Sequence, residues 1–199
     1  KLAVGDVLEF SGPHGRFTLH EGERPILFIA GATGFAPIKS IVEDAFARGL
    51  VRPMWLYWGV RRRADLYAQA LAEQWQREHE HFHFVPVLSD PDPADGWRGR
   101  TGPVHEAMLA DFPDLRDHEV YVCGSVRMVE AAVPAFLAQG LAEGFCFTDA
   151  FVPSASAART RSPLTSMIFA LPCTVSVMIP TWLPVKLIAS MPRSLSAMH

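Results

Sequence analysis

The stretch that decides the fold is Arg24-Pro-Ile-Leu-Phe-Ile-Ala-Gly-Ala-Thr-Gly-Phe-Ala-Pro-Ile-Lys-Ser40. Its residues 26–30 are continuously apolar, which is typical of a strand covered on both faces. Gly31-Ala-Thr-Gly34 predicts a turn, and Pro37 falls where the first turn of a helix accepts proline. The apolar residues that follow recur at spacings of three and four, which predicts a helix. A strand, a glycine turn and a helix in this order favour a phosphate site at the helix start, although two glycines alone also fit a plain tight turn.

The pattern of strand and helix repeats along the chain. Further strands are expected at residues 53–59, 82–88, 119–123 and 146–151, and helices at 65–79, 102–111 and 128–139. Alternation at this spacing indicates βαβ units with right-handed crossovers. The predicted fold class is therefore α/β, with a five-stranded, parallel, doubly wound, Rossmann-like sheet over residues 21–153. Its ligand crevice is expected beyond the carboxyl ends of the strands, and Pro86 predicts an edge position for the strand at 82–88.

The two ends of the chain differ from this pattern. Residues 1–20 contain two short expected strands, at 7–10 and 16–19, which are too small to be stable alone and resemble the closing edge of a β domain. Residues 154–199 form a third region, in which no charged side chain occurs between Arg161 and Lys186. A membrane span over 162–185 is one reading. Interior prolines favour the other reading, a disordered or non-native extension.

Composition narrows the class of protein. The 199 residues are 49% hydrophobic and 20% charged, as in soluble globular proteins. A net charge of −3 and the lack of a basic stripe argue against a nucleic-acid partner. The three cysteines suit neither a disulfide framework nor a zinc site, and with no apolar leader a cytoplasmic protein is expected. The histidine tract at 78–83 reads as an exposed strand face rather than a metal site, so no metal is predicted.

Small clusters follow the predicted strands and carry a family resemblance. They are Gly31-Ala-Thr-Gly34, Trp58-Gly-Val-Arg61, Leu88-Ser-Asp90 and Cys123-Gly-Ser-Val-Arg-Met128. Together they resemble the pyridine-nucleotide domain of the ferredoxin–NADP reductase superfamily. Asp65-Leu-Tyr67, Trp97-Arg-Gly-Arg-Thr-Gly102 and Asp149-Ala-Phe151 resemble, within it, the CDP-6-deoxy-delta-3,4-glucoseen reductases and the phenol-hydroxylase reductase components. Gly12-Pro-His-Gly-Arg-Phe17 is similar to the junction that leaves the family's flavin barrel, so residues 1–20 are read as a barrel remnant.

The resemblance implies an NAD(P)H-dependent flavoprotein, in which hydride passes to FAD and single electrons then reach an iron–sulfur acceptor. The residues implied to bind the nucleotide are Gly31, Thr33, Gly34, Pro37, Gly59, Arg61, Ser89, Asp90, Gly124, Ser125 and Met128. Cys123 and Phe151 are implied beside the reacting rings, as the catalytic positions. Five of them have a structural alternative: Thr33 as a helix cap, Arg61 as a solvated side chain, and Cys123, Met128 and Phe151 as core.

Two details qualify the implied activity. Asp90 would repel a 2′-phosphate, which favours NADH over NADPH, although Arg61 and the two arginines after it could offset this repulsion. The family's arginine–x–tyrosine–serine/threonine flavin signature is absent from the 199 residues, so poor FAD binding is expected. The chain is therefore read as the nucleotide-binding part of a longer reductase, and the alternatives are an inactive nucleotide-binding fragment or a membrane-tethered protein.

Overall fold

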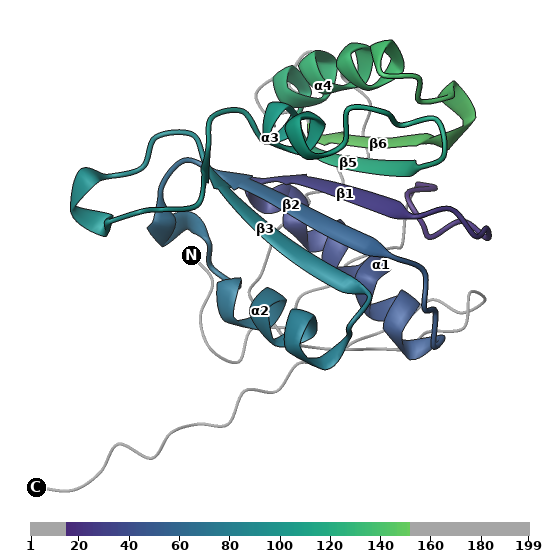
Figure 1. The fold of residues 1–199 in the computed structure, drawn as a ribbon, viewed down its shortest axis with the longest axis horizontal. Helices are drawn as coiled ribbons and strands as arrows, with labels where there is room; N and C mark the ends of the chain where they lie inside the picture. The colour runs from purple at the N-terminus through teal and green to yellow at the C-terminus, as the bar shows by residue number, and fades with distance from the viewer. Residues whose placement is uncertain (1–14, 152–199) are drawn as a thin grey trace, which may run out of the picture. The chain divides into compact units, whose positions relative to one another are not determined.

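The computed structural model describes residues 15–151, which form a parallel sheet with helices on both faces (Figure 1). The strands are β1 (Ile26–Gly31), β2 (Met54–Val60), β3 (Phe82–Leu88), β4 (Arg100–Thr101), β5 (Glu119–Ser125) and β6 (Cys146–Phe151). The helices are α1 (Phe35–Ala47), α2 (Gln69–Glu78), α3 (Val104–Asp111) and α4 (Val126–Ala138). Short 3₁₀ turns lie at Ala32–Gly34, Arg63–Asp65, Pro93–Asp95 and Glu143–Phe145.

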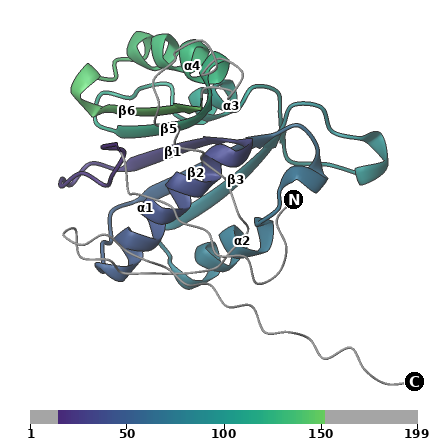
Figure 2. The same cartoon turned by 180° about the vertical axis from the view of Figure 1, so that it is seen from behind.

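The strand order is β4-β3-β2-β1-β5-β6, and every pair is parallel. The order reverses direction between β1 and β5, because the chain first adds strands on one side of β1 and then on the other. Helices α1 and α2 cover one face of the sheet, and α3 and α4 cover the other (Figures 1 and 2). The predicted doubly wound α/β fold is confirmed, and such folds bind ligands at the point of reversal.

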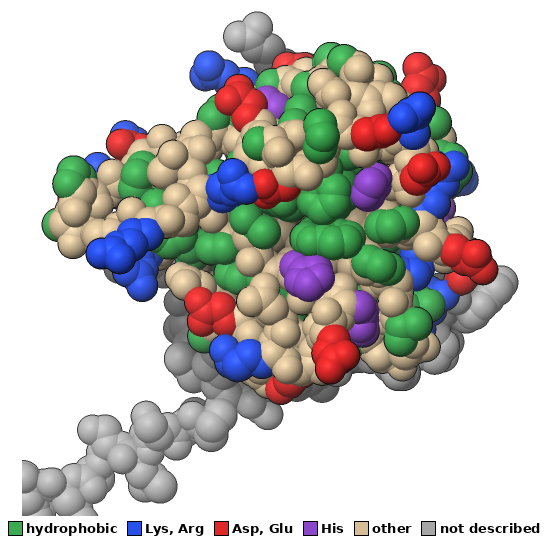
Figure 3. All heavy atoms as spheres, viewed as in Figure 1, with side chains coloured by type: hydrophobic (Ala, Val, Ile, Leu, Met, Phe, Trp, Pro, Cys, Tyr) green, Lys and Arg blue, Asp and Glu red, His purple; other side chains and the backbone are tan. Residues whose placement is uncertain are grey.

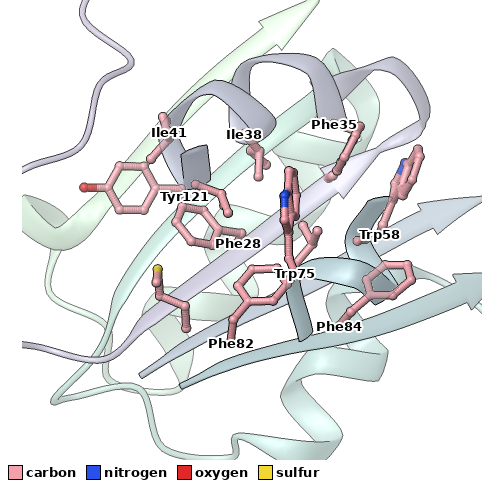
Figure 4. Close-up of a cluster of buried hydrophobic side chains, with 14 of the residues drawn as sticks. Phe28, Phe35, Ile38, Ile41, Trp58, Trp75, Phe82, Phe84 and Tyr121 are labelled. Carbon is pink, nitrogen blue, oxygen red and sulfur yellow. The ribbon is translucent and has the colours of Figure 1, made fainter. Parts of the chain in front are cut away.

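Two apolar layers hold the helices on the sheet. Alternate residues of β1 point to opposite faces: Phe28 packs with α1 and α2, whereas Leu27 and Ile29 pack with α3 and α4. Figure 4 shows the first layer, in which aromatic side chains from the sheet and from both helices interlock. Because β1 is buried on both faces, its sequence is continuously apolar instead of alternating.

The sheet has one strand more than the five predicted. β4 has only two residues, which are exposed and pair with the last two residues of β3, so they lack the apolar signal of a strand. β3 is consequently an edge strand along most of its length, Pro86 included, as predicted. The loop between β3 and β4 projects beyond the carboxyl ends of the strands (Figure 1).

Two other sequence-based expectations were wrong. The strand expected at residues 16–19 is irregular in the structure, and the following backbone N–H of His20 donates to the Tyr121 hydroxyl at 2.9 Å. The helix expected from residue 65 begins at Gln69, because the Asp65 carboxylate accepts from the Arg62 N–H and closes a separate turn. The strand predicted at 7–10 and the extension at 154–199 lie outside the described residues. Among the helices of residues 15–151, none is both long and apolar enough to span a bilayer.

A buried ion pair fixes the entry of the chain into the sheet. Arg52, which precedes β2, lies 2.8 Å from Glu119 at the start of β5, and the two side chains are only 8% and 2% exposed. The Arg52 guanidinium also donates to the carbonyl of Arg24 at 2.8 Å and to that of His20 at 3.2 Å. These contacts tie the segment before β1 to the amino ends of the strands.

Candidate functional site

A cavity of about 500 Å³ opens at the carboxyl edge of the sheet, where the strand order reverses. Among the predicted site residues, Gly31, Thr33, Gly59, Arg61, Ser89, Ser125, Met128 and Phe151 line it. It is also lined by Ala32, Val60, Gly102, Pro103 and Val104. Its volume lies within the range of small-molecule and cofactor sites.

Three helices begin beside this cavity. The turn before α1, the Gly102–Val104 start of α3 and the Ser125 cap of α4 all contribute to its wall. The Ser125 hydroxyl oxygen accepts from the Met128 N–H at 3.3 Å and so caps α4. The first N–H groups of a helix have no partner within it, and the helix dipole is positive at that end. The cavity therefore suits an anionic group such as a phosphate.

The turn after β1 adopts an uncommon backbone conformation. Ala32 has a φ of +47°, in the left-handed region that non-glycine residues rarely occupy. Its carbonyl oxygen accepts a hydrogen bond from the indole nitrogen of Trp58 at 2.9 Å. Left-handed conformations cost an L-residue about 1–2 kcal/mol, and such strain is concentrated at functional sites.

Close packing requires the glycines of the predicted site. A Cβ at Gly34 would lie against the Cys123 carbonyl and 2.9 Å from the Gly124 nitrogen, and one at Gly59 would lie 2.6 Å from Val104 Cβ. Met128 covers Gly31 and Gly124 together, and a Cβ at Gly124 would come 2.7 Å from its methyl group. Gly34, Gly124 and Pro37 are not among the residues that line the cavity. The close approach of the first turn to β5 requires Gly34, and the close approach of α3 to β2 requires Gly59.

The two predicted catalytic residues lie in different environments. Phe151, at the end of β6, lines the cavity and also packs against the core on the α1 side. Cys123 is fully buried in that core and is not part of the cavity wall. Burial, with a smaller contribution from Asp149, raises the pKa of the Cys123 thiol to about 12, so the sulfur is a neutral, small apolar group.

Arg61 and Asp90 form an ion pair at the rim of the cavity. The Arg61 Nε lies 3.0 Å from an Asp90 carboxylate oxygen, and both side chains are largely exposed. Backbone hydrogen bonds join the same two loops, from the Ser89 N–H to the Val60 carbonyl and from the Asp90 N–H to the Arg61 carbonyl, each 2.9 Å long. The loops after β2 and β3 therefore form one connected rim, in which Arg61 lines the cavity and Asp90 holds Arg61.

Sequence reasoning missed one wall of the site. Gly102, Pro103 and Val104 repeat the pattern of the first turn: a strand end, a glycine and then the start of a helix. That repetition could have identified them, but the two-residue β4 gave no strand signal. No side-chain cluster within residues 15–151 has the three or more ligands of a metal site. On the face shown in Figure 3, acidic and basic side chains are interspersed.

The chain matches a known family and several known proteins. Residues 28–133 match the family described as "Oxidoreductase NAD-binding domain". The chain is 44% identical over 154 residues to the CDP-6-deoxy-L-threo-D-glycero-4-hexulose-3-dehydrase reductase of Yersinia pestis. This alignment covers 77% of this chain and 46% of that protein. It is 35% identical over 165 residues to the phenol hydroxylase P5 protein of Acinetobacter pittii, covering 81% and 46% respectively.

A solved structure agrees with these relatives. The crystal structure of the Amycolatopsis cytochrome P450 reductase GcoB matches with a TM-score of 0.66 and 38% identity, over 72% of this chain and 43% of that protein. The chain thus spans about half the length of the curated relatives that it matches.

Proposed function

This chain belongs to the family of oxidoreductase NAD-binding domains, and we propose that its cavity binds NADH or NADPH and presents the nicotinamide to a flavin. The observation that carries the proposal is the ring of helix starts around the cavity at the reversal between β1 and β5. The similarity to a dehydrase reductase and to a phenol hydroxylase protein supports electron flow from the nucleotide through a flavin to a partner.

The turn after β1 and the start of α4 bind the dinucleotide phosphates. Gly31 and Thr33 contribute backbone and hydroxyl groups on one side, and Ser125 on the other. These donors and two helix dipoles neutralise the diphosphate. The fit rests on residues of the turn after β1 and the start of α4 that carry such donors and line one cavity.

The nicotinamide end packs against the apolar part of the wall. Phe151 and Met128 supply a flat ring and a flexible thioether, which orient a planar ring and exclude water from it. When bound there, reduced nicotinamide would supply a hydride, that is two electrons and one proton, for transfer to a flavin. We expect an iron–sulfur protein or domain to be the acceptor of the electrons. The predicted contact between Cys123 and the nicotinamide stays a prediction, to be tested in Cys123→Ala by the rate of hydride transfer.

The rim pair selects the nucleotide. Asp90 already engages Arg61, so a 2′-phosphate would meet an occupied guanidinium and a repelling carboxylate. We expect NADH to bind more tightly than NADPH. Asp90→Asn removes the negative charge and frees Arg61, which should strengthen NADPH binding about three-fold, in line with an exposed ion pair, and leave NADH binding nearly unchanged. Fluorescence titration with each nucleotide measures both; a wild-type preference for NADPH would contradict the assignment.

The proposal is tested by titrating the full chain with NADH and following its backbone amide resonances. Residues 31–36 and the first turn of α4 should shift together and saturate with one dissociation constant. AMP serves as the control, since it lacks the diphosphate and should leave the turn after β1 unmoved. If NADH and NADPH both left these amides in place, no nucleotide would bind at the cavity.

A second candidate function is nucleotide binding without hydride transfer by these 199 residues alone. It is favoured because the chain spans only 46% of the length of each of these two relatives. Adding FAD and NADH to the chain without oxygen separates the two candidates. Bleaching of the flavin absorbance that depends on the chain supports the reductase. NADH binding without bleaching supports the second candidate.

A further inference from the structure

Trp58, in β2, contacts the turn of the proposed phosphate site. Its side chain is fully buried, and its indole nitrogen donates to the Ala32 carbonyl at 2.9 Å. Its ring stacks on that of Phe35, with the ring centroids 4.1 Å apart and the planes at 11°. Figure 4 shows both side chains in the same apolar layer. Ala32 begins the short turn and Phe35 follows it, so one side chain contacts both ends of the segment.

This hydrogen bond acts on the strained residue of the turn. Ala32 has a φ of +47° and lines the cavity. A left-handed L-residue relaxes to a commoner conformation unless its surroundings hold it there. Relaxation would rotate the peptide groups of Ala32 and Thr33, two residues that line the cavity. The indole N–H of Trp58 binds the Ala32 carbonyl and so opposes this rotation.

We propose that Trp58 is a positioning residue for dinucleotide binding, acting through its indole N–H on the Ala32 carbonyl. Trp58 is not part of the cavity wall, so its effect reaches the ligand through the turn. The inference rests on the proposed function, because it concerns the affinity of the same site. Phenylalanine would fill most of the indole volume but lacks the donor.

The test replaces Trp58 by phenylalanine in the full chain and measures NADH affinity by calorimetry. Loss of one hydrogen bond to a strained turn should weaken NADH binding about five-fold. Trp75→Phe is the matched control, because Trp75 is another buried indole of the same layer that packs among Phe35, Phe46 and Phe82. Its NADH affinity should equal that of the wild type.

A rescue experiment distinguishes positioning from packing. In the double variant Trp58→Phe with Ala32→Gly, glycine occupies the left-handed conformation without strain, so NADH binding should recover most of the lost affinity. Equal affinity in Trp58→Phe and the wild type would overturn the inference. So would a weakened Trp58→Phe that glycine at residue 32 does not improve, since Trp58 would then act only by filling space.

A measurement on the unmodified chain covers the case in which Trp58→Phe fails to fold. The indole N–H of Trp58 should exchange slowly with solvent and shift on addition of NADH, whereas that of Trp75 should not shift. A rapidly exchanging or unmoved Trp58 resonance overturns the inference while NADH binding stands. A wild-type chain that bound no NADH would instead refute the proposed function itself, whatever the variants did.

Discussion

Replacing Gly34 by alanine tests whether the contact between the first turn and β5 is as tight as the structure indicates. Gly34 has helical dihedrals, with φ −59° and ψ −12°, so alanine suits its backbone and would ordinarily stabilise it. The added methyl group, however, would meet the Cys123 carbonyl and lie 2.9 Å from the Gly124 nitrogen. These are backbone atoms of β5, which β1 and β6 hold on both sides, so they cannot move independently.

The expected loss is about 3 kcal/mol of unfolding free energy, the upper end for overpacking. With a urea m-value of about 2 kcal/mol/M, the unfolding midpoint should fall by about 1.5 M. Circular dichroism during urea titration measures the midpoint. Gly144→Ala is the control, because nothing lies within 4 Å of a Cβ there, and its midpoint should stay within about 0.3 M of wild type. A Gly34→Ala midpoint inside that same interval would refute the packing argument.

Three further predictions follow from contacts away from the cavity or within its turn. Arg52→Met leaves the buried Glu119 carboxylate unpaired and should cost about 3–5 kcal/mol in urea unfolding, whereas a loss below 1 kcal/mol would show that water reaches the pair. Ala32→Gly relieves the left-handed alanine and should raise the unfolding free energy by about 0.5–1 kcal/mol in the same assay, and a decrease would contradict the strain. Burial, chiefly, raises the pKa of Tyr121 to about 12. The unfolded state therefore releases this proton first as pH rises above 10, and stability should decline between pH 10 and 12. Between pH 10 and 12, the denaturant midpoint should fall less in Tyr121→Phe than in the wild type. An equal fall of the midpoint with pH in both proteins would count against the raised pKa of Tyr121.

The sequence predicted the strands and helices whose apolar patterns are long. The run at 26–30 appears as expected, because burial on both faces requires continuous apolar residues there. The strand at 82–88 also appears as expected, since most of its residues are apolar although His83 is exposed. β4 was missed for the opposite reason, since two exposed residues carry no such pattern. Likewise, the helix at Gln69 starts late because a local carboxylate bond at Asp65 competes with helix propagation.

Some residues of the site could also be predicted from the sequence, and others could not. Residues at or just after strand ends, such as Thr33, Arg61 and Ser125, could be placed at one edge because parallel strands end together. The left-handed Ala32 and its bond to Trp58 could not, because a sequence carries no signal for a strained alanine or for a contact across 26 positions. Cys123 is buried because helices cover both faces of β5, and that tertiary packing leaves no local signal at a strand end.

The Arg52–Glu119 pair and the cavity occupy opposite ends of the same strands, separated by the six residues of β1, or about 20 Å. At that separation, substitutions at the two ends should combine additively. An engineer could therefore reinforce the amino end for heat tolerance and alter coenzyme choice at the other end in independent rounds of mutagenesis.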